Sequence, residues 1–259
     1  MSETQKNSNR YTINSIDKAL DLLEILSEKS FNLLELVEQL DQPKSSIYRM
    51  ITTFEKRGYI TREKEDGKYC LGLKMLELTK NLLEKNTLIS VANAEMQKLV
   101  SKTGESVNLG VLDGNEILYV AVFEGEHQLK FTEALGSKSP IHATAIGKTL
   151  AAYLPNEQLN ELLQEIEFKK ITPNTITNKT EFNKELEFVR EKGYALDNEE
   201  IAIGARCIAA PIFDMFGNIE AAISISGAVH RLSNEQFNEM TNEVVSSAQS
   251  ISRKLGFDK

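Results

Sequence analysis

The sequence predicts an α+β protein: an N-terminal winged helix-turn-helix, a linker helix, and a larger domain built on an antiparallel sheet. Three observations support this prediction. Residues 33–57 contain two apolar repeats of helical period, residues 59–71 alternate as a small hairpin, and residues 106–227 contain strands on both sides of a helical stretch. Strands grouped apart from helices are typical of an α+β domain.

Two short helices are predicted from apolar residues at positions i, i+3, i+4 and i+7, which share one helical face. The first helix carries this pattern at Leu33, Leu36, Val37 and Leu40, and the second at Ile47, Met50, Ile51 and Phe54. Pro43 lies between them, where it stops the first helix and suits the start of the second, with Asp41 or Gln42 as cap. The segment is therefore predicted to be a helix-turn-helix.

The outer face of the second helix is polar and suits DNA. Its stripe and the residues beside it are Lys44, Ser45, Ser46, Tyr48, Arg49, Thr52, Thr53 and Lys56. An arginine can bond a guanine edge twice, and hydroxyls and lysine can bond phosphates. The second helix of a helix-turn-helix enters the major groove with its N-terminal residues first. The segment alone leaves a second interpretation open, a solvated helix face in a helical hairpin.

A short hairpin after the second helix favours the DNA-binding interpretation. Gly58 ends the helix, residues 59–63 form a strand, Asp66-Gly67 is a strong two-residue turn signal, and residues 68–71 form the return strand. Two helices followed by such a hairpin make a winged helix-turn-helix. The basic residues of this wing are expected to reach the DNA backbone beside the groove. They are Arg62, Lys64 and Lys68.

Charge is distributed unevenly along the chain. The net charge is −8, yet residues 42–62 hold five Lys or Arg against one Glu, a local charge of +4. A basic patch on an acidic protein suits specific docking on DNA better than indiscriminate adhesion to polyanions.

The composition is that of a soluble globular protein, with 41% hydrophobic and 26% charged residues. No apolar run is long enough to span a bilayer and no signal peptide opens the chain, so we expect a cytoplasmic protein without membrane association. The two cysteines, Cys70 and Cys207, lie far apart, and their spacing indicates neither a disulfide framework nor a metal site. We expect no cofactor.

The predicted domain boundaries are a disordered tail at 1–10, the winged helix-turn-helix at 11–73, a linker helix region at 74–102 and a second domain at 103–259. A first helix, capped by Asn14 or Ser15, runs to Glu28 as a scaffold, with an apolar face made of Ile16, Ala19, Leu20, Leu23 and Leu26. The apolar phase of the linker breaks near Asn86, which predicts two helices or one kinked helix. Its apolar side faces either a partner subunit, since a two-fold dimer doubles the DNA contact, or the second domain.

The second domain is predicted to contain strands at 106–112, 116–123, 128–131, 206–213 and 219–227. Helices are predicted from about 143 to 154, from 155 to 166, and from 180 to 192, the last capped by Thr180 and ended by Gly193. A final helix opens with Ser233 and Gln236, an S-x-x-Q capping box.

Five motifs in this order resemble the IclR-type bacterial transcription regulators over nearly the whole chain. They are SIDKALDLLEIL, PKSSIYRMITTFEKRGYI, PIHATAIGKTLAAYL, DNEEIAIGARCIAAPIFD and AAISISG, with the wing after the second. The resemblance implies a winged helix-turn-helix, a linker helix and a GAF-like effector-binding domain, assembled as a homodimer or homotetramer. It also implies operator DNA and a small carboxylate effector as partners, the effector being a keto acid, a sugar acid or an aromatic acid. Most members of the family repress an operon and some activate.

By similarity, the effector-contacting positions fall at Ala145, Ile146, Asp197, Cys207, Ser224 and Ser226. A helix that starts near Ala143 offers free backbone N–H groups to a carboxylate, and Thr144 can add a hydroxyl. Many relatives have Gly where this chain has Ala145 or Ile146, which leaves the size of the ligand open.

Each of these positions also has a purely structural interpretation. Ser224 and Ser226 lie two apart on a strand and face one side, where local hydrogen bonds would suffice for them. Cys207 suits a small core position, and Asp197 suits a cap or an ion pair.

Three functions follow from these features. The leading hypothesis is a DNA-binding regulator, of the repressor type, whose operator binding is controlled by a small organic acid. The alternative is a GAF-like small-molecule enzyme that uses Cys207, although no second cysteine and no nucleophilic triad accompany it. A third is a protein-interaction module in which the wing does not bind DNA.

Overall fold

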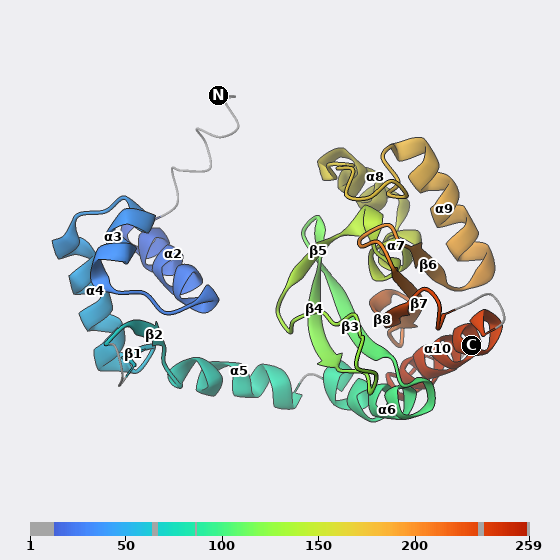
Figure 1. Cartoon of the computed structure of the whole chain (residues 1–259), viewed down its shortest axis with the longest axis horizontal. Coiled ribbons are helices and arrows are strands. Elements are labelled where there is room, and N and C mark those ends of the chain that lie inside the picture. Colours follow the sequence, from blue (N-terminus) through green and yellow to red (C-terminus); the bar gives the residue numbers. More distant parts are fainter. Residues whose placement is uncertain (1–12, 64–66, 86, 233–235, 258–259) are drawn as a thin grey trace. The chain divides into compact units, whose positions relative to one another are not determined.

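The structure is a computed structural model that describes residues 13–63, 67–85, 87–232 and 236–257 (Figure 1). It divides into two compact units between Lys85 and Asn86, and each unit is described by itself. The expected tail at 1–10, the wing residue Lys64 and the capping residue Ser233 lie outside the described residues.

The first unit is a winged helix-turn-helix, as predicted. Its elements are α2 (Asn14–Glu28), α3 (Leu33–Leu40), α4 (Lys44–Arg57), β1 (Ile60–Arg62), β2 (Tyr69–Leu71) and α5 (Lys74–Lys85). β1 and β2 pair antiparallel. Its core is made of buried apolar side chains from all elements except α5: Leu22, Leu26, Phe31, Leu36, Ile47, Ile51, Ile60 and Tyr69.

The N-terminal half of α2 departs from the prediction. Ile16 and Leu20 were expected to pack inward, but they are 53% and 52% exposed, while Leu22 and Leu26 are buried. The reason is that only the C-terminal half of α2 packs on the core. The side chains of its first turns therefore remain exposed to solvent. The expected Asn14 or Ser15 cap is also wrong, because Ile13 holds the N-cap position without a side-chain bond.

The turn between α3 and α4 uses different residues from those expected. Neither Asp41 nor Gln42 caps α4: Pro43 is its N-cap and makes no side-chain cap bond. Asp41 instead reverses the chain in the left-handed conformation at φ 46°, which Asp tolerates better than most residues. Gln42 accepts a hydrogen bond of 2.8 Å from the Lys18 ammonium of α2. The turn is therefore tied to the first helix.

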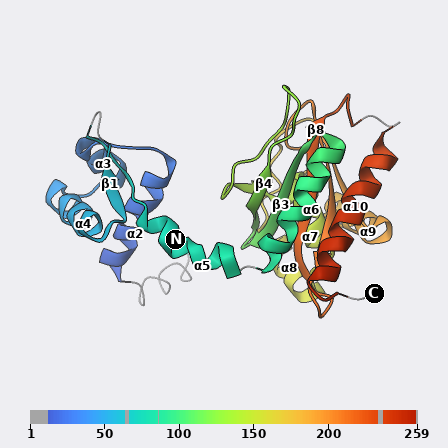
Figure 2. The same cartoon turned by 90° about the horizontal axis from the view of Figure 1, so that it is seen from below.

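The second unit is an antiparallel six-stranded sheet in the order β5-β4-β3-β8-β7-β6. Its strands are β3 (Ser106–Asp113), β4 (Glu116–Phe123), β5 (Lys138–Pro140), β6 (Ala195–Asn198), β7 (Ala205–Phe213) and β8 (Ile219–Ala228). Helices α6 (Thr87–Thr103) and α10 (Phe237–Lys254) pack on one face (Figure 2). Helices α7 (Ala145–Ala152), α8 (Asn156–Glu165) and α9 (Lys179–Lys192) contribute to a second core on the other face. This confirms the α+β prediction.

Four local predictions for this unit are wrong. The helix expected to open with a Ser233 and Gln236 capping box begins at Phe237, and Gln236 is its N-cap without a side-chain bond. Residues 128–131 form no strand: the Leu129 carbonyl accepts from the Arg231 guanidinium at 2.9 Å, and β5 takes the place beside β4. α7 begins at Ala145 and not at Ala143, because residues 141–143 form a 3₁₀ turn. α9 is capped by Asn178 and not by Thr180.

A buried ion pair joins the start of the sheet to the segment before α10. The Arg231 guanidinium donates two hydrogen bonds to the Glu105 carboxylate, at 2.6 and 2.8 Å, and Glu105 is 1% exposed. We predict that Arg231→Ala lowers the free energy of unfolding by about 3–5 kcal/mol, because it leaves a buried carboxylate without its partner. Urea denaturation measures this loss.

The control is Lys102→Ala, which removes a more exposed pair to Glu243 and should cost less than about 1 kcal/mol. Equal losses in the two variants would contradict the prediction.

Candidate DNA-binding surface and effector pocket

The outer face of α4 is exposed to solvent. Lys44, Ser45, Tyr48, Arg49, Thr52 and Lys56 are all exposed, and Ser46 is half-buried. Within the described part of the chain, the charged ends of Lys44, Arg49 and Lys56 have no hydrogen-bond or ion-pair partner. The Thr52 hydroxyl donates to the Tyr48 carbonyl at 2.8 Å, which leaves its oxygen able to accept. The positive charges on this face are therefore uncommitted.

The start of α4 is also suited to an anion. No acid occupies its first turn, and its N-cap residue Pro43 satisfies no backbone N–H group with a side chain. Free N–H groups and the positive end of the helix dipole attract phosphate. The same helix end therefore combines a favourable dipole with the Lys44 and Arg49 side chains.

The wing residues are more constrained than the α4 residues. Arg62 pairs with Glu55 of α4 at 3.1 Å and lies over the Tyr69 ring, 4.7 Å from its centroid. The hydrogen bond that Arg62 donates to the Glu55 carboxylate raises the pKa of the Arg62 guanidinium. Lys68 is half-buried. Arg62 thus braces the wing against α4, and a contact with DNA would compete with that pair.

One cavity brings together all the residues predicted for the effector. Its lining consists of Tyr119, Glu133, Thr144, Ala145, Ile146, Asp197, Ile201, Cys207, Ser224 and Ser226. Asp197, Cys207 and Ser226 are paired in register across β6, β7 and β8, so they form a row on one face of the sheet. α7 lies against that face and supplies the opposite wall.

The first turn of α7 presents backbone donors to this cavity. The Thr144 hydroxyl caps the helix by accepting from the Gly147 N–H at 3.1 Å, and it donates to the Pro140 carbonyl at 3.0 Å. The N–H groups of Ala145 and Ile146 precede the first intrahelical bond and have no partner in the described part of the chain. These donors suit a carboxylate.

Asp197 is the most perturbed acid of the pocket. Its Oδ1 accepts from the Glu200 N–H at 2.7 Å, whereas its Oδ2 is buried without a partner. Burial raises the pKa of Asp197 to about 7, with a smaller contribution from the Glu200 carboxyl, against the opposing effects of the Glu200 N–H hydrogen bond and of Lys148. At neutral pH this carboxyl is therefore partly protonated and able to donate a hydrogen bond.

A buried lysine holds the strand that carries Asp197. Lys148 of α7 is 1% exposed, and its ammonium donates to Glu200 at 2.6 Å, to Glu185 at 3.3 Å and to the Leu196 carbonyl. Leu196 and Glu200 flank Asp197 in the chain, so this network sets the position of the Asp197 backbone. Sequence reasoning missed Lys148, because a lysine on a short helix reads as a solvated residue.

Sequence reasoning also missed Tyr119, Glu133 and Ile201, which line the cavity. Burial raises the pKa of Glu133, of the Tyr119 hydroxyl and of the Cys207 thiol. Tyr119 could have been found from the alternation along β4. The other two lie on irregular segments, where periodicity gives no signal.

The cavity is small, with a volume of about 20 Å³. This is room for about one water molecule, well below the 300–1,000 Å³ that is usual for small-molecule sites. Ile146 contributes to the small volume, because its side chain fills the space over Gly110, where an added Cβ would lie 2.8 Å from it. A larger ligand therefore requires side chains of the lining to move.

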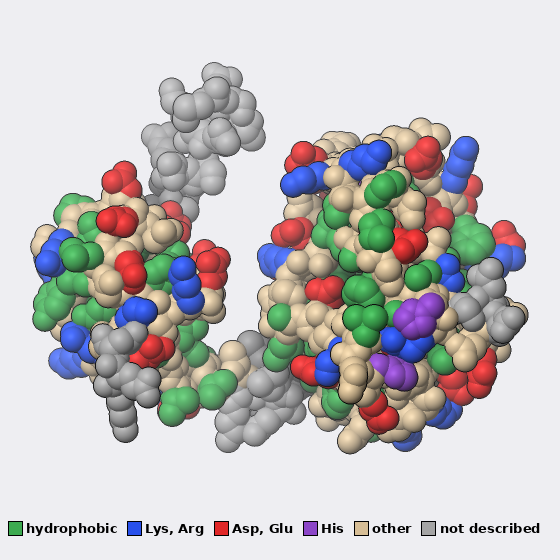
Figure 3. All heavy atoms as spheres, in the orientation of Figure 1, with side chains coloured by type: hydrophobic (Ala, Val, Ile, Leu, Met, Phe, Trp, Pro, Cys, Tyr) green, Lys and Arg blue, Asp and Glu red, His purple; other side chains and the backbone are tan. Residues whose placement is uncertain are grey.

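No helix among the described residues is long and apolar enough to cross a membrane. Among the same residues, no group of His, Cys, Asp and Glu side chains is arranged to hold a metal ion. On the visible face of the second unit, acidic and basic side chains are interspersed, so no single acidic patch forms there (Figure 3).

The fold and the exposed basic helix define a helix-turn-helix DNA-binding protein with a second, pocket-bearing domain. Comparison with known proteins identifies its family. A model described as "IclR helix-turn-helix domain" matches residues 15–64, and one described as "Bacterial transcriptional regulator IclR C-terminal" matches residues 80–253. The chain belongs to the IclR family of bacterial transcriptional regulators.

Similar proteins agree with this assignment. The regulator KdgR of Dickeya chrysanthemi is 36% identical over 95% of this chain and 81% of its own length. The transcriptional repressor IclR of Escherichia coli is 30% identical over 94% of this chain and 90% of its own length. The crystal structure of Thermotoga maritima IclR matches with a TM-score of 0.80 and 34% identity, over 95% of this chain and all of that one. The chain is thus a helix-turn-helix transcriptional regulator.

The Asp197 carboxyl should give the protein a characteristic pH dependence. In the folded protein it keeps its proton up to about pH 7, whereas in the unfolded chain it loses it near pH 4. Between these values the folded state binds more protons, so the free energy of unfolding falls as pH rises, and the effect is complete above pH 7. Asp197→Asn should lack this fall, which urea denaturation at pH 5, 6, 7 and 8 measures.

The difference in the free energy of unfolding between the parent and Asp197→Asn should change by up to about 1.4 kcal/mol per pH unit between pH 5 and 7. Stability profiles that run parallel across this range would show that Asp197 is not protonated in the folded protein.

Proposed function

We propose that this regulator binds double-stranded operator DNA through α4 and the wing, and that a small carboxylate in the second unit controls the binding. The observation that carries the first part is the exposed, unpaired Arg49 on a helix end without acids. In a winged unit such a residue faces base edges in the major groove, while Ser45, Ser46 and Thr52 face phosphates. Repression is the proposed direction, supported by the similarity to a repressor.

The pocket supports a small organic acid as effector. The Ala145 and Ile146 N–H groups can bind its carboxylate, and the Ser224 and Ser226 hydroxyls lie on the opposite wall. Protonated Asp197 can donate to a keto or hydroxyl oxygen. The side chains of Ala145 and Ile146 and the small cavity favour the smaller acids, such as short keto acids, over sugar acids and aromatic acids.

A homodimer or homotetramer is the proposed assembly. The start of α5 exposes Leu73 and Leu76 by 79% and 64%, and Leu78 is also exposed. Exposed leucines suit burial against a second copy, and a two-fold pair of winged units doubles the contact with DNA. The proposed compartment is the cytoplasm, where bacterial operators lie.

Catalysis by Cys207 is the less favoured alternative. Burial and the neighbouring Asp197 raise the pKa of its thiol well above the ordinary value, so the reactive thiolate is scarce at neutral pH. Its neighbours in register are Asp197 and Ser226, and the Asp197 carboxylate is a far weaker base than the Cys207 thiolate. We therefore propose a binding role for Cys207 and no enzyme activity.

DNA binding is tested on a promoter fragment that the protein protects in footprinting. Arg49→Ala should weaken binding to that fragment by about 1–3 kcal/mol, because a base contact is lost, with a smaller effect on unrelated DNA. Lys56→Ala should weaken binding to both DNAs evenly and make the salt dependence shallower. Absence of any protected promoter, at low salt as well as high, would refute operator binding.

The effector pocket is tested by enlarging it. Ile146→Ala removes most of the side chain over Gly110 and so enlarges the cavity. The variant's preference should shift from pyruvate towards 4-hydroxybenzoate and gluconate by about tenfold. Calorimetric titration with these three acids measures the change. Ile203→Ala, at an exposed position outside the cavity lining, is the control. If Ile146→Ala binds the three acids with the same relative affinities as the parent, the effector does not bind in this cavity.

A further inference from the structure

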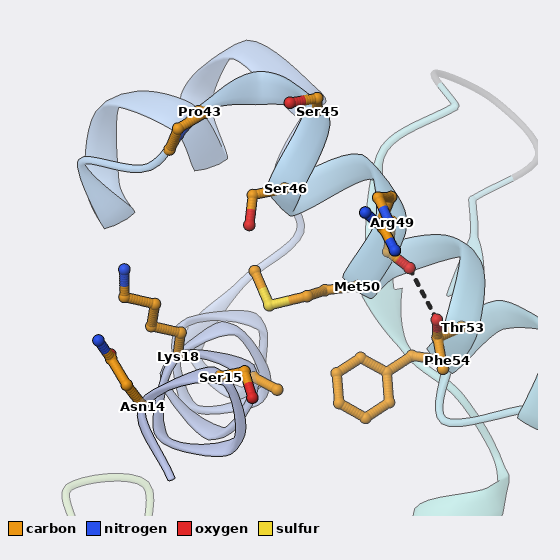
Figure 4. Close-up of a pocket in the computed structure, with 11 residues that line it drawn as sticks. Asn14, Ser15, Lys18, Pro43, Ser45, Ser46, Arg49, Met50, Thr53 and Phe54 are labelled. Atoms are coloured by element: carbon orange, nitrogen blue, oxygen red, sulfur yellow. Dashed lines mark hydrogen bonds between the residues drawn. The ribbon is translucent and has the colours of Figure 1, made fainter.

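A groove runs between the first turns of α2 and the flank of α4 in the first unit. Figure 4 shows Asn14, Ser15 and Lys18 of α2 on one side and Ser46 and Arg49 of α4 on the other. The groove has a volume of about 710 Å³ and is lined by Asn14, Ser15, Lys18, Ala19, Pro43, Ser45, Ser46, Arg49, Met50, Thr53 and Phe54. It is open to solvent, and none of its lining residues in the described part of the chain is acidic.

The chemistry of the groove divides into a floor and a rim. Ala19, Met50 and Phe54 supply apolar contact surface between the helices (Figure 4). The rim is made of hydroxyl, amide and cationic groups, including Lys18 and Arg49. Asp17, the acid in the first turn of α2, is not part of the lining.

The composition of α2 along one face explains why this groove is polar. Lys18 precedes Leu22 by four positions, and Ser15, Ala19, Leu22 and Leu26 follow one another at three or four positions, so all share one helical face. That face is apolar where it enters the core, at Leu22 and Leu26, and polar where it extends beyond the core. Lys18 ties the α3–α4 turn to α2 through Gln42 and also carries a positive charge into the groove, and Ser15 adds a hydroxyl there.

The groove is continuous with the proposed DNA-binding face, because Ser45, Ser46 and Arg49 belong to both. The backbone of a DNA strand is a ridge of deoxyribose rings edged by phosphates, which matches an apolar floor with a cationic rim. We propose that the sugar–phosphate backbone of one operator strand lies in this groove, and that Lys18 contacts a phosphate outside the reach of α4. This rests on the proposed operator binding by α4.

In the proposed complex α2 is a DNA-binding element and not only a scaffold. The Lys18 ammonium is held in place by its 2.8 Å hydrogen bond to Gln42, so it is oriented before DNA arrives. One phosphate contact changes the slope of log Kobs against log salt by about 0.9, and this change is independent of DNA sequence.

The first test compares Lys18→Gln with Lys29→Gln, which removes the same charge from the other end of α2. Binding to the protected promoter fragment and to unrelated DNA is measured from about 50 to 200 mM salt. Lys18→Gln should make the slope shallower by about one and weaken binding to both DNAs several-fold, and Lys29→Gln should change neither. An unchanged slope in Lys18→Gln would overturn the proposal.

The second test separates DNA contact from folding. Ser15→Glu places a negative charge at the start of α2, where the helix dipole favours it, so thermal stability should hold or rise. The same charge faces the groove and should weaken DNA binding at least tenfold. Undiminished DNA binding by Ser15→Glu would contradict the proposal. A change in oligomeric state with an unchanged salt slope would also overturn it, since it would show that a second copy occupies the groove.

The experiments distinguish backbone binding in the groove from operator binding by α4. If Arg49→Ala weakens promoter binding and Lys18→Gln does not, α4 reads the operator without the groove. If neither variant differs from the parent and no promoter is protected, operator binding itself is refuted.

Discussion

The burial of one side of α4 is the constraint on which the DNA-binding unit depends. Ile47 and Ile51 are fully buried, so the helix cannot rotate about its axis without exposing them. This locks Arg49 and the hydroxyls beside it on the outside, and it aims the flank of Met50 and Phe54 at α2. The proposed base-reading face and the adjoining groove are therefore consequences of the same apolar repeat, and a change that loosens the core would disturb both.

In the second unit a buried charge, and not apolar packing, fixes the position of the candidate site. Lys148 crosses from α7 to the β6 region and binds groups on both sides of Asp197. The helix end and the row of sheet residues are thus held at a set distance around the cavity. An effector that alters the protonation or hydrogen bonding of Asp197 would act on this network directly. The raised pKa of Asp197 makes the pocket sensitive to protons in the physiological range.

Much of this architecture was predictable, because it depends on local patterns. The apolar repeats of α3 and α4, the wing and the hairpin of β3 and β4 follow from spacing within a few residues. The failures have a common physical origin in distant contacts. Ile16 and Leu20 belong to an apolar repeat but remain exposed. Residues 128–131 are held by a hydrogen bond from Arg231, which is distant in the sequence. Glu133 and Ile201 line the cavity from segments without periodicity.

By itself the sequence determined the two-domain order, the helix-turn-helix with its exposed polar helix face and, through its resemblance to a family, the residues that meet around one cavity. Local periodicity and short motifs carry that information. Only the tertiary structure decided that the cavity is small, that Arg62 is paired with Glu55, and that α2 and α4 enclose a groove. These features depend on side chains brought together from separate elements, and no pattern within a single segment records how such elements pack.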